Sequence, residues 1–244
     1  MSRDHKKSQN FLRSPQIAMM LVGHTNIKKS DFTLDIGAGS GVFTYALSKK
    51  SAQVLAVEND ESAVQKLRDN IKNLDNVEIF TDDFFDFNLN RLPNNYKVCS
   101  NIPFHLSSPI LKQLTNAQNQ PMAIYLILQK QFARKLMAND RRFTSILGAQ
   151  LYPFYDIKIK KPLQKTDFTP PPAVDTAFLE MKRREKSLVN HDENYKRMIE
   201  VLFTDNEKFK RAVANTKFKD LKPSQLTGKE WLEIFSAQYD RIGR

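Results

Sequence analysis

The stretch LDIGAGSG, residues 34–41, decides the fold of this chain. A short apolar run ends in an acid, three glycines follow at alternate positions, and residues 42–49 have the composition of a helix. Strand, glycine-rich turn and helix in this order bring backbone N–H groups against a ligand, because glycine lacks a Cβ and adopts positive φ. The spacing is G-x-G-x-G, which differs from the G-x-G-x-x-G of dinucleotide sites and by itself also fits a plain turn.

Apolar runs alternate with helical patterns on both sides of this turn. The expected strands are 33–36, 53–57, 77–80, 96–100 and 122–128, and the expected helices are 42–50, 61–73, 107–115 and 129–138. Such alternation is typical of a parallel, doubly wound α/β sheet, in which ligands bind beyond the carboxyl ends of the strands. Gly37, Glu58, Asp83 and Asn101 all lie at or just after these ends, so we expect them to share one site.

The pattern changes in the second half of the chain. Residues 156–160 and 174–182 alternate like strands around the sequence FTPPP at 168–172, which predicts an antiparallel hairpin at the end of the sheet. A charged junction at 182–186 precedes helical patterns at 194–203, 208–214 and 229–235. We therefore predict a first domain at 1–185, with a basic N-terminal arm, and a small all-α domain at 186–244.

The charge balance points to a polyanionic partner. The 244 residues include 38 Lys and Arg against 27 Asp and Glu, a formal net charge of +11, which favours nucleic acid or an anionic membrane surface. No apolar run approaches the roughly 20 residues of a membrane span, and residues 1–13 lack the apolar core of a signal peptide. The single cysteine, Cys99, fits a reducing cytoplasm, and its spacing from the histidines predicts no metal site.

Three acids indicate the kind of cofactor. Glu58 lies about 20 residues after the first glycine, where an acid accepts hydrogen bonds from ribose hydroxyls. Asp83 can accept from an exocyclic amine, although it also fits a solvated acid in a loop. Asp35 adds negative charge beside the glycine turn, which favours an ammonium or sulfonium and opposes a pyrophosphate. S-adenosylmethionine has these features, whereas a dinucleotide does not.

The sequence NIPF, residues 101–104, suggests a reaction. An aromatic exocyclic amine is a poor nucleophile because its lone pair is delocalised, and two acceptors on its N–H bonds would localise that pair. The Asn101 side-chain oxygen and the backbone carbonyl of Ile102 or Pro103 can be these acceptors. Pro103 fixes the turn, and Phe104 offers a ring on which a base can stack. The same tetrapeptide also fits a strand that ends in a proline turn.

Together with QNFL at residues 9–12, these motifs resemble the rRNA adenine N6-methyltransferase family, the KsgA/Erm group, over residues 6–182. Ser8, the short helical tail and Trp231-Leu232 are more similar to the Erm branch, which methylates 23S rRNA and confers macrolide–lincosamide–streptogramin B resistance. The KsgA branch usually has Gly before the Gln, and Leu in N-L-P-Y; its 16S rRNA chemistry stays an alternative. The resemblance implies a Rossmann-like, mostly parallel seven-stranded sheet of a class I S-adenosylmethionine-dependent methyltransferase, acting as a cytoplasmic monomer before or during ribosome assembly.

The resemblance also implies roles for single residues. The implied cofactor-binding residues are Asn10, Leu12, Gly37, Gly39, Glu58, Asp83 and Asn101. Asn101 would hold the target amine beside Pro103, Phe104 would stack on the flipped adenine, and Phe168 would cover the other face of that base. Most members carry Tyr at position 104, so the phenol oxygen is dispensable here if the function holds. Phe168 also fits a core aromatic.

Basic residues are candidates for phosphate contacts, although a basic run also fits a solvated face. They are Lys6 and Lys7 in the arm, Arg134, Arg141 and Arg142 after the fifth strand, and Lys208, Lys210 and Arg211 in the tail. Two further interpretations stay open. One is a non-catalytic nucleic-acid-binding protein on a methyltransferase scaffold, and the other is a nicotinamide-dependent oxidoreductase, which the glycine spacing and Asp35 disfavour.

Overall fold

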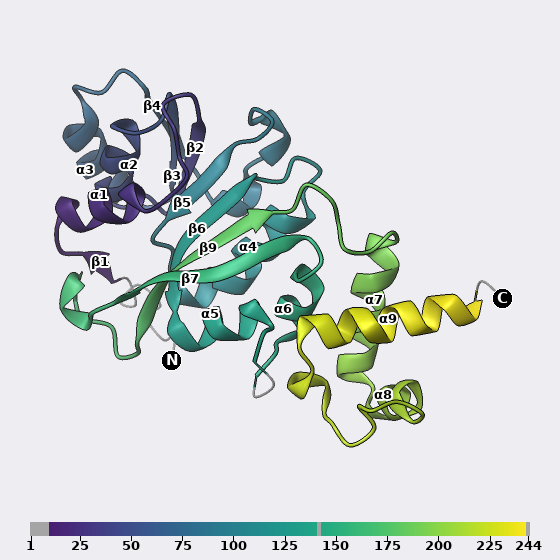
Figure 1. Ribbon diagram of the computed structural model, residues 1–244. Helices are drawn as coiled ribbons and strands as arrows, with labels where there is room; N and C mark the ends of the chain where they lie inside the picture. The colour runs from purple at the N-terminus through teal and green to yellow at the C-terminus, as the bar shows by residue number, and fades with distance from the viewer. Residues whose placement is uncertain (1–9, 141–142, 243–244) are drawn as a thin grey trace, which may run out of the picture. The chain divides into compact units, whose positions relative to one another are not determined.

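A computed structural model describes residues 10–140 and 143–242, the last four as backbone only (Figure 1). The chain forms two compact units: Met1–Lys130 with Ile159–Met181, and Gln131–Lys158 with Lys182–Arg244. This division differs from the expected single boundary after residue 185, because residues 131–158 belong with the C-terminal helices.

A seven-stranded sheet has the order β4-β3-β2-β5-β6-β9-β7. Its strands are β2 (Phe32–Ile36), β3 (Gln53–Glu58), β4 (Val77–Thr81), β5 (Lys97–Ser100), β6 (Ala123–Gln129), β7 (Tyr155–Leu163) and β9 (Thr176–Arg183). The first five pair in parallel, with β2 between β3 and β5. The predicted doubly wound α/β fold is confirmed, and the strand order reverses beside β2, where such sheets bind ligands.

In the first unit, α1 (Pro15–Gly23) precedes these strands, and α2 (Val42–Ser48), α3 (Glu61–Ile71) and α4 (Ser107–Asn116) connect them. α1 begins as the sequence predicts, since the Ser14 hydroxyl accepts from the backbone N–H of Gln16 at 3.1 Å and Pro15 takes the first helical position. α3 begins at Asp60, whose carboxylate accepts from the N–H of Ala63 at 2.9 Å. These two caps therefore set where α1 and α3 begin.

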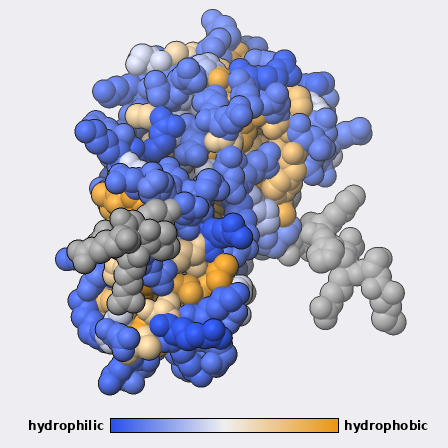
Figure 2. Space-filling model, turned by 90° about the vertical axis from the view of Figure 1, so that its right-hand side faces the viewer, coloured by the Kyte–Doolittle hydropathy of each residue, from blue (hydrophilic) through white to orange (hydrophobic). Residues whose placement is uncertain are grey.

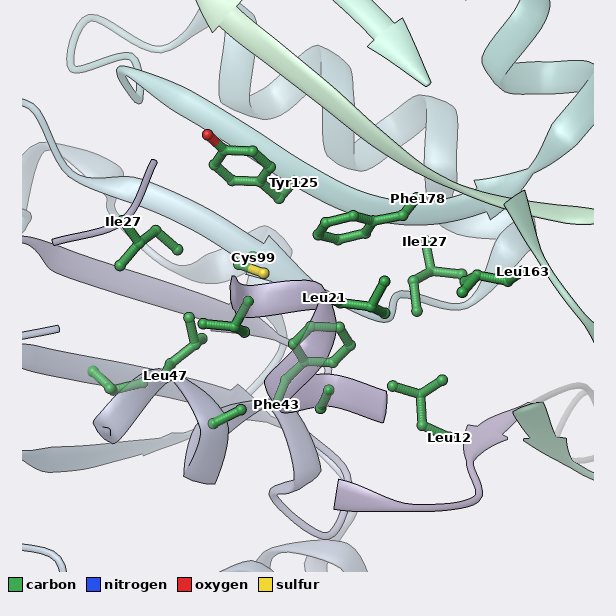
Figure 3. Close-up of a cluster of buried hydrophobic side chains, with 14 of the residues drawn as sticks. Leu12, Leu21, Ile27, Phe43, Leu47, Cys99, Tyr125, Ile127, Leu163 and Phe178 are labelled. Carbon is green, nitrogen blue, oxygen red and sulfur yellow. The ribbon is translucent and has the colours of Figure 1, made fainter. Parts of the chain in front are cut away.

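The core of the first unit joins α1 and α2 to the sheet. Leu21, Leu47, Cys99 and Tyr125 are completely buried there, and Leu12 reaches the same cluster from the N-terminal segment (Figure 3). Each such side chain stabilises the fold by about 1.5–3 kcal/mol through burial. This packing holds the N-terminal segment against the sheet.

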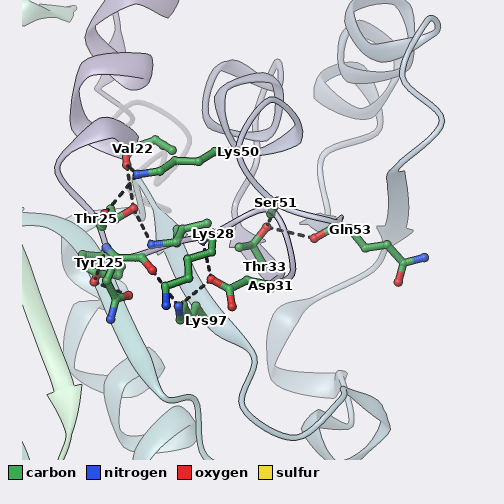
Figure 4. Close-up of polar contacts among 12 residues, drawn as sticks. Val22, Thr25, Lys28, Asp31, Thr33, Lys50, Ser51, Gln53, Lys97 and Tyr125 are labelled. Atoms are coloured by element: carbon green, nitrogen blue, oxygen red, sulfur yellow. Dashed lines mark hydrogen bonds and ion pairs between the residues drawn. The ribbon is translucent and has the colours of Figure 1, made fainter.

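Polar contacts fix the loop between α1 and β2 (Figure 4). Lys97 forms a largely buried ion pair with Asp31 at 2.6 Å and donates to the Asn26 carbonyl at 2.9 Å. Lys50 donates to the carbonyls of Val22 and Thr25 at 2.8 and 3.1 Å, and burial lowers the pKa of its ammonium. Both lysines thereby satisfy backbone acceptors at the end of α1.

The second unit is helical, apart from the strand ends that enter it. Its helices are α5 (Lys130–Met137), α6 (Ile146–Leu151), α7 (Asp192–Thr204), α8 (Asn206–Val213) and α9 (Gly228–Ile242). The core packs Tyr195, Phe209 and Trp231 with Ala149 of α6. A Cβ at Gly148 would lie 2.3 Å from the Lys135 carbonyl, so α6 crosses α5 at a contact that only glycine allows. The Tyr195 hydroxyl of α7 also donates to the Ala149 carbonyl at 3.0 Å, so α6 packs on the C-terminal helices and residues 131–158 join the second unit.

The surface is largely hydrophilic on the face that Figure 2 shows, with hydrophobic residues gathered in a few places. Within the described residues, no helix has the length and apolar character needed to cross a membrane.

Candidate active site

A cavity of about 1000 Å³, measured with its open mouth, lies within the first unit at the carboxyl ends of β2, β3 and β5. Its walls include the N-terminal segment, the glycine turn, the acids after β3 and β4, and the NIPF segment. The predicted site residues that line it are Asn10, Leu12, Gly37, Gly39, Glu58, Asp83, Asn101, Pro103 and Phe104. The structure therefore brings these nine predicted residues together, although they come from widely separated parts of the sequence.

The glycine turn between β2 and α2 has the conformation that its sequence predicts. Gly37, Gly39 and Gly41 have φ values of 64°, 56° and 89°, a region where other residues are strained. The N–H of Gly37 donates to the Val57 carbonyl at 2.8 Å, which ties the turn to β3. A Cβ at Gly39 would lie 3.3 Å from the ring of Phe11, so the N-terminal segment also needs glycine here.

The Glu58 carboxylate is buried and held by backbone donors. Its Oε1 accepts from the N–H groups of Asn59 and Asp60 at 3.0 and 2.9 Å, and its Oε2 accepts from Gly39 at 2.8 Å. A carboxylate offers about four acceptor positions, so one position on Oε2 is left for a ligand. Glu58 thus joins the end of β3 to the glycine turn and retains an acceptor in the cavity wall.

Asp83 lies in the cavity wall at the start of a short 3₁₀ turn, Phe84–Asp86. Its Oδ1 accepts from the N–H of Phe85 at 2.9 Å, so this oxygen caps the turn. The Oδ2 atom takes no part in that bond. One oxygen thus orients the carboxylate and the other is available to an amine.

Asp35 contributes a charge that depends on pH. It is 1% exposed and lines the cavity, and the Thr44 hydroxyl donates to its Oδ2 at 2.8 Å. Burial raises the pKa of Asp35 to about 7, against the opposing effect of hydrogen bonds from Thr44 and Ser100. The expected negative charge beside the glycine turn is therefore only partly developed at neutral pH.

The NIPF segment follows β5 and faces the glycine turn. The Asn101 Nδ2 donates to the Asn10 carbonyl at 2.7 Å, and a Cβ at Gly37 would lie 3.7 Å from the Pro103 Cδ. Phe104 is half-buried and packs against the core cluster while lining the cavity. Asn101 and the glycine turn thus share one cavity, as the sequence predicts.

Two features at the cavity were not predicted from the sequence. Residues 11 and 12 form a short strand, β1 (Phe11–Leu12), which pairs antiparallel with β8 (Phe168–Thr169). Phe11 and Phe85 line the cavity with 44% and 40% of their surfaces exposed, so they add two aromatic rings to its wall. Neither the β1–β8 pairing nor the exposure of these two rings has a local sequence signal beyond the presence of a phenylalanine.

The prediction that Phe168 covers the target base is wrong for this structure. Phe168 is completely buried, belongs to the core cluster of the first unit and is absent from the cavity wall. Its pairing with Leu12 in the β1–β8 ladder turns the ring into the core. A phenylalanine before a proline run has the same local sequence in either role, and only tertiary packing separates the two.

Phe168→Ala should therefore lower the free energy of unfolding by about 3–5 kcal/mol, the usual cost of emptying a buried aromatic site. Urea denaturation followed by circular dichroism measures this loss. Phe85→Ala is the matched control, because an exposed ring should cost less than about 1 kcal/mol. An unchanged stability of the Phe168 variant, together with lost activity, would restore the base-stacking role.

The basic candidates are placed only in part. Lys6, Lys7, Arg141 and Arg142 lie outside the described residues. Arg134 is exposed on α5, and Lys208, Lys210 and Arg211 are exposed on α8, all in the second unit. Lys208 and Lys210 form local ion pairs of 3.2 Å with Asp205 and Glu207, and exposed pairs of this kind exchange easily for phosphate.

Comparisons with known proteins agree with this geometry. A model of the family described as ribosomal RNA adenine dimethylase matches residues 2–229. The chain is 31% identical over 227 residues to ribosomal RNA small subunit methyltransferase A of Mycoplasmopsis synoviae, a match that covers 91% of this chain and 86% of that protein. It is 27% identical over 241 residues to rRNA adenine N-6-methyltransferase of Lysinibacillus sphaericus, with 95% of each chain covered.

Solved structures show the same fold. The 23S rRNA methyltransferase ErmE superposes with a TM-score of 0.79 at 22% identity, over 93% of this chain and 98% of that one. A dimethyladenosine transferase from Plasmodium falciparum gives a TM-score of 0.74 at 20% identity, over 96% and 98%. At these identities the likeness concerns the fold alone.

Proposed function

Because the chain belongs to the ribosomal RNA adenine dimethylase family, we propose that it methylates N6 of one adenine in 23S rRNA and so confers macrolide–lincosamide–streptogramin B resistance. Family membership confirms the predicted enzyme class, an rRNA adenine methyltransferase, and its methyl donor, S-adenosylmethionine. Beyond this, we propose the RNA substrate, the adenine that is methylated, the resistance that follows and the residues that carry out the reaction.

The cavity fits the methyl donor by the acceptors in its wall. The free acceptor on Glu58 suits a ribose hydroxyl, and the free oxygen of Asp83 suits the adenine amine. The glycine turn lets the methionine part of the cofactor approach the backbone closely. Ionised Asp35 adds the negative charge that a sulfonium and an ammonium favour.

The observation that carries the proposal is the place of Asn101 in the same cavity as the glycine turn. When bound, the cofactor supplies a methyl group activated by its sulfonium sulfur. The Asn101 Oδ1 and a backbone carbonyl of Ile102 or Pro103 each accept a hydrogen bond from one N–H group of the target amine. These two hydrogen bonds localise the lone pair of the amine nitrogen. Phe104 stacks on the extruded base, which repays part of the few kcal/mol that extrusion costs. The methylated amine is acidic enough to lose its proton to water, so the chain needs no general base.

Two residues favour 23S rRNA, because Ser8 and Ile102 differ from the residues usual in the KsgA branch. The second candidate is 16S rRNA during ribosome assembly, favoured by 31% identity to a small subunit methyltransferase. In either case we propose a cytoplasmic monomer that acts before or during assembly and uses no metal.

Methylation of purified RNA separates the candidates. The protein is incubated with radiolabelled S-adenosylmethionine and protein-free 23S or 16S rRNA, and the modified base is located by primer extension and mass spectrometry. Label at one 23S adenine supports the proposal, and label on 16S rRNA alone supports the second candidate. Binding of RNA without label on either would indicate a non-catalytic protein. Erythromycin tolerance of a host expressing the protein tests the resistance.

RNA affinity should depend steeply on salt, and α8 should supply part of that dependence. If Lys208, Lys210 and Arg211 each contact a phosphate, their triple replacement by glutamine should reduce the slope of log K against log salt by about 2. Filter binding between 50 and 300 mM KCl measures the slope. The control replaces Lys66 and Arg68 on α3 and Lys72 at its C-terminal cap by glutamine, which removes the same charge from exposed positions elsewhere. Equal slopes for both variants would remove α8 from the RNA surface.

A further inference from the structure

Asn10, in the cavity wall, connects Asn101 to the proline-rich segment. Its side-chain Nδ2 donates to the Pro170 carbonyl at 2.8 Å, and its backbone carbonyl accepts from the Asn101 Nδ2 at 2.7 Å. The side chain of Asn10, which the sequence analysis assigns to the cofactor, thus has its donor turned to the proline-rich segment. The backbone of the same residue meets Asn101.

The bond to the Asn10 carbonyl determines which way the Asn101 amide faces. A backbone carbonyl only accepts hydrogen bonds, so the NH₂ end of the amide must be the end that faces it. The planar amide then directs its Oδ1 away from Asn10. Asn101 lines the cavity, and among the described residues no donor to its Oδ1 is found. This oxygen is therefore free to accept from a target amine.

Without this bond the amide has two orientations of similar energy. The terminal torsion of asparagine is broad, so the oxygen and nitrogen ends exchange easily. In the exchanged orientation the Asn101 NH₂ would face the NH₂ of the target base, and two donors repel each other. The Asn10 carbonyl thus selects the orientation that the proposed reaction needs.

The rest of the N-terminal segment is held independently of Asn10. β1 pairs with β8, Leu12 is buried in the core, and the N–H of Arg13 donates to the Asp167 carbonyl at 2.8 Å. Asn10 precedes this ladder, and its bond to Pro170 extends the attachment by one residue. The position of its carbonyl therefore depends on its own side chain as well as on the strand.

We propose that Asn10 is a positioning residue: its side chain, held by Pro170, places its own carbonyl on the Asn101 NH₂ and so turns the Asn101 oxygen toward the target adenine. This role rests on the proposed function and adds a residue to it. It differs from direct contact with the cofactor, because the effect of Asn10 passes through Asn101.

Asn10→Ala should lower kcat about 10–100-fold while the Kd of S-adenosylmethionine, measured by calorimetry, changes less than about 3-fold. Asn10→Asp should behave alike, because its carboxylate oxygens have no proton to give the Pro170 carbonyl. In an Asn101→Ala background the Asn10→Ala change should add less than about 2-fold, since the residue it acts through is gone. A tenfold weaker Kd with unchanged kcat, or additive losses in the double variant, would overturn the proposal.

Thr169→Val is the matched structural control. It removes the hydroxyl that accepts from the Arg13 Nε at 3.4 Å and leaves both the β1–β8 ladder and the Asn10 bonds in place. Its kcat should stay within about 2-fold of the wild type. An equal loss in this variant would assign the effect to the stability of the strand and contradict a specific role for Asn10.

A readout besides activity separates this proposal from the proposed function. The side-chain NH₂ resonances of Asn101, assigned by their loss in Asn101→Ala, should shift in Asn10→Ala and stay in place in Thr169→Val. This result would support the positioning role even if neither rRNA is methylated. Unchanged resonances in Asn10→Ala would refute it even in a fully active enzyme.

Discussion

Asn101→Ala should lower kcat by about 10²–10³-fold, the usual effect of removing one preorganised hydrogen-bonding group from a reacting centre. Alanine takes away the Oδ1 that we propose as an acceptor for the target amine, so the lone pair of that amine should stay delocalised. Single-turnover methylation of RNA at saturating cofactor measures the loss. RNA binding should be unchanged, because Asn101 lies in the cavity of the first unit and the basic candidates on α5 and α8 lie in the second.

Two comparisons make this result specific. Asn116→Ala, at an exposed position at the end of α4, should leave kcat within about 2-fold of the wild type. Asn101→Asp keeps an oxygen acceptor but has no NH₂ for the Asn10 carbonyl, so it should retain little activity. Full activity in Asn101→Ala would assign the amine-holding role to the backbone carbonyls alone.

Local sequence determines most of what the sequence analysis predicted well. The glycine turn has positive φ at three alternate positions, which glycine adopts without strain. Because a strand that ends in an acid precedes these glycines, the segment has few other conformations. Parallel strands then bring their carboxyl ends to one edge, so Glu58, Asp83 and Asn101 meet without any further information.

The parts that the sequence left open depend on contacts between distant residues. β1 and β8 have two residues each and lie far apart in the chain, so neither has a period that predicts the pairing. The same pairing buries Phe168 and places the Asn10 carbonyl on Asn101. The division into units likewise depends on the packing of Ala149 against Tyr195, which no local pattern predicts.

The charge on Asp35 gives the second prediction, because a buried acid in the wall of the proposed cofactor cavity links folding and binding to pH in opposite directions. Its pKa rises from 3.8 to about 7 on folding, so the folded state holds a proton that the unfolded state has released between these values. Stability should therefore fall as pH rises from about 4 to 7 and then level off. Cofactor binding should show the reverse trend, since only ionised Asp35 attracts the positive ligand.

Asp35→Asn should remove both trends. At pH 8 the variant should be more stable than the wild type by about 3–5 kcal/mol, because each pKa unit of the shift corresponds to 1.36 kcal/mol. The wild type should bind S-adenosylmethionine about tenfold more tightly at pH 8 than at pH 6, where roughly a tenth of Asp35 is ionised. Urea denaturation and calorimetry across pH 5–9 measure the two quantities on both proteins. The asparagine keeps an acceptor for the Thr44 hydroxyl, so the difference between the profiles isolates the charge. Parallel profiles would mean that Asp35 keeps one protonation state throughout, and its titration would then control neither stability nor cofactor binding.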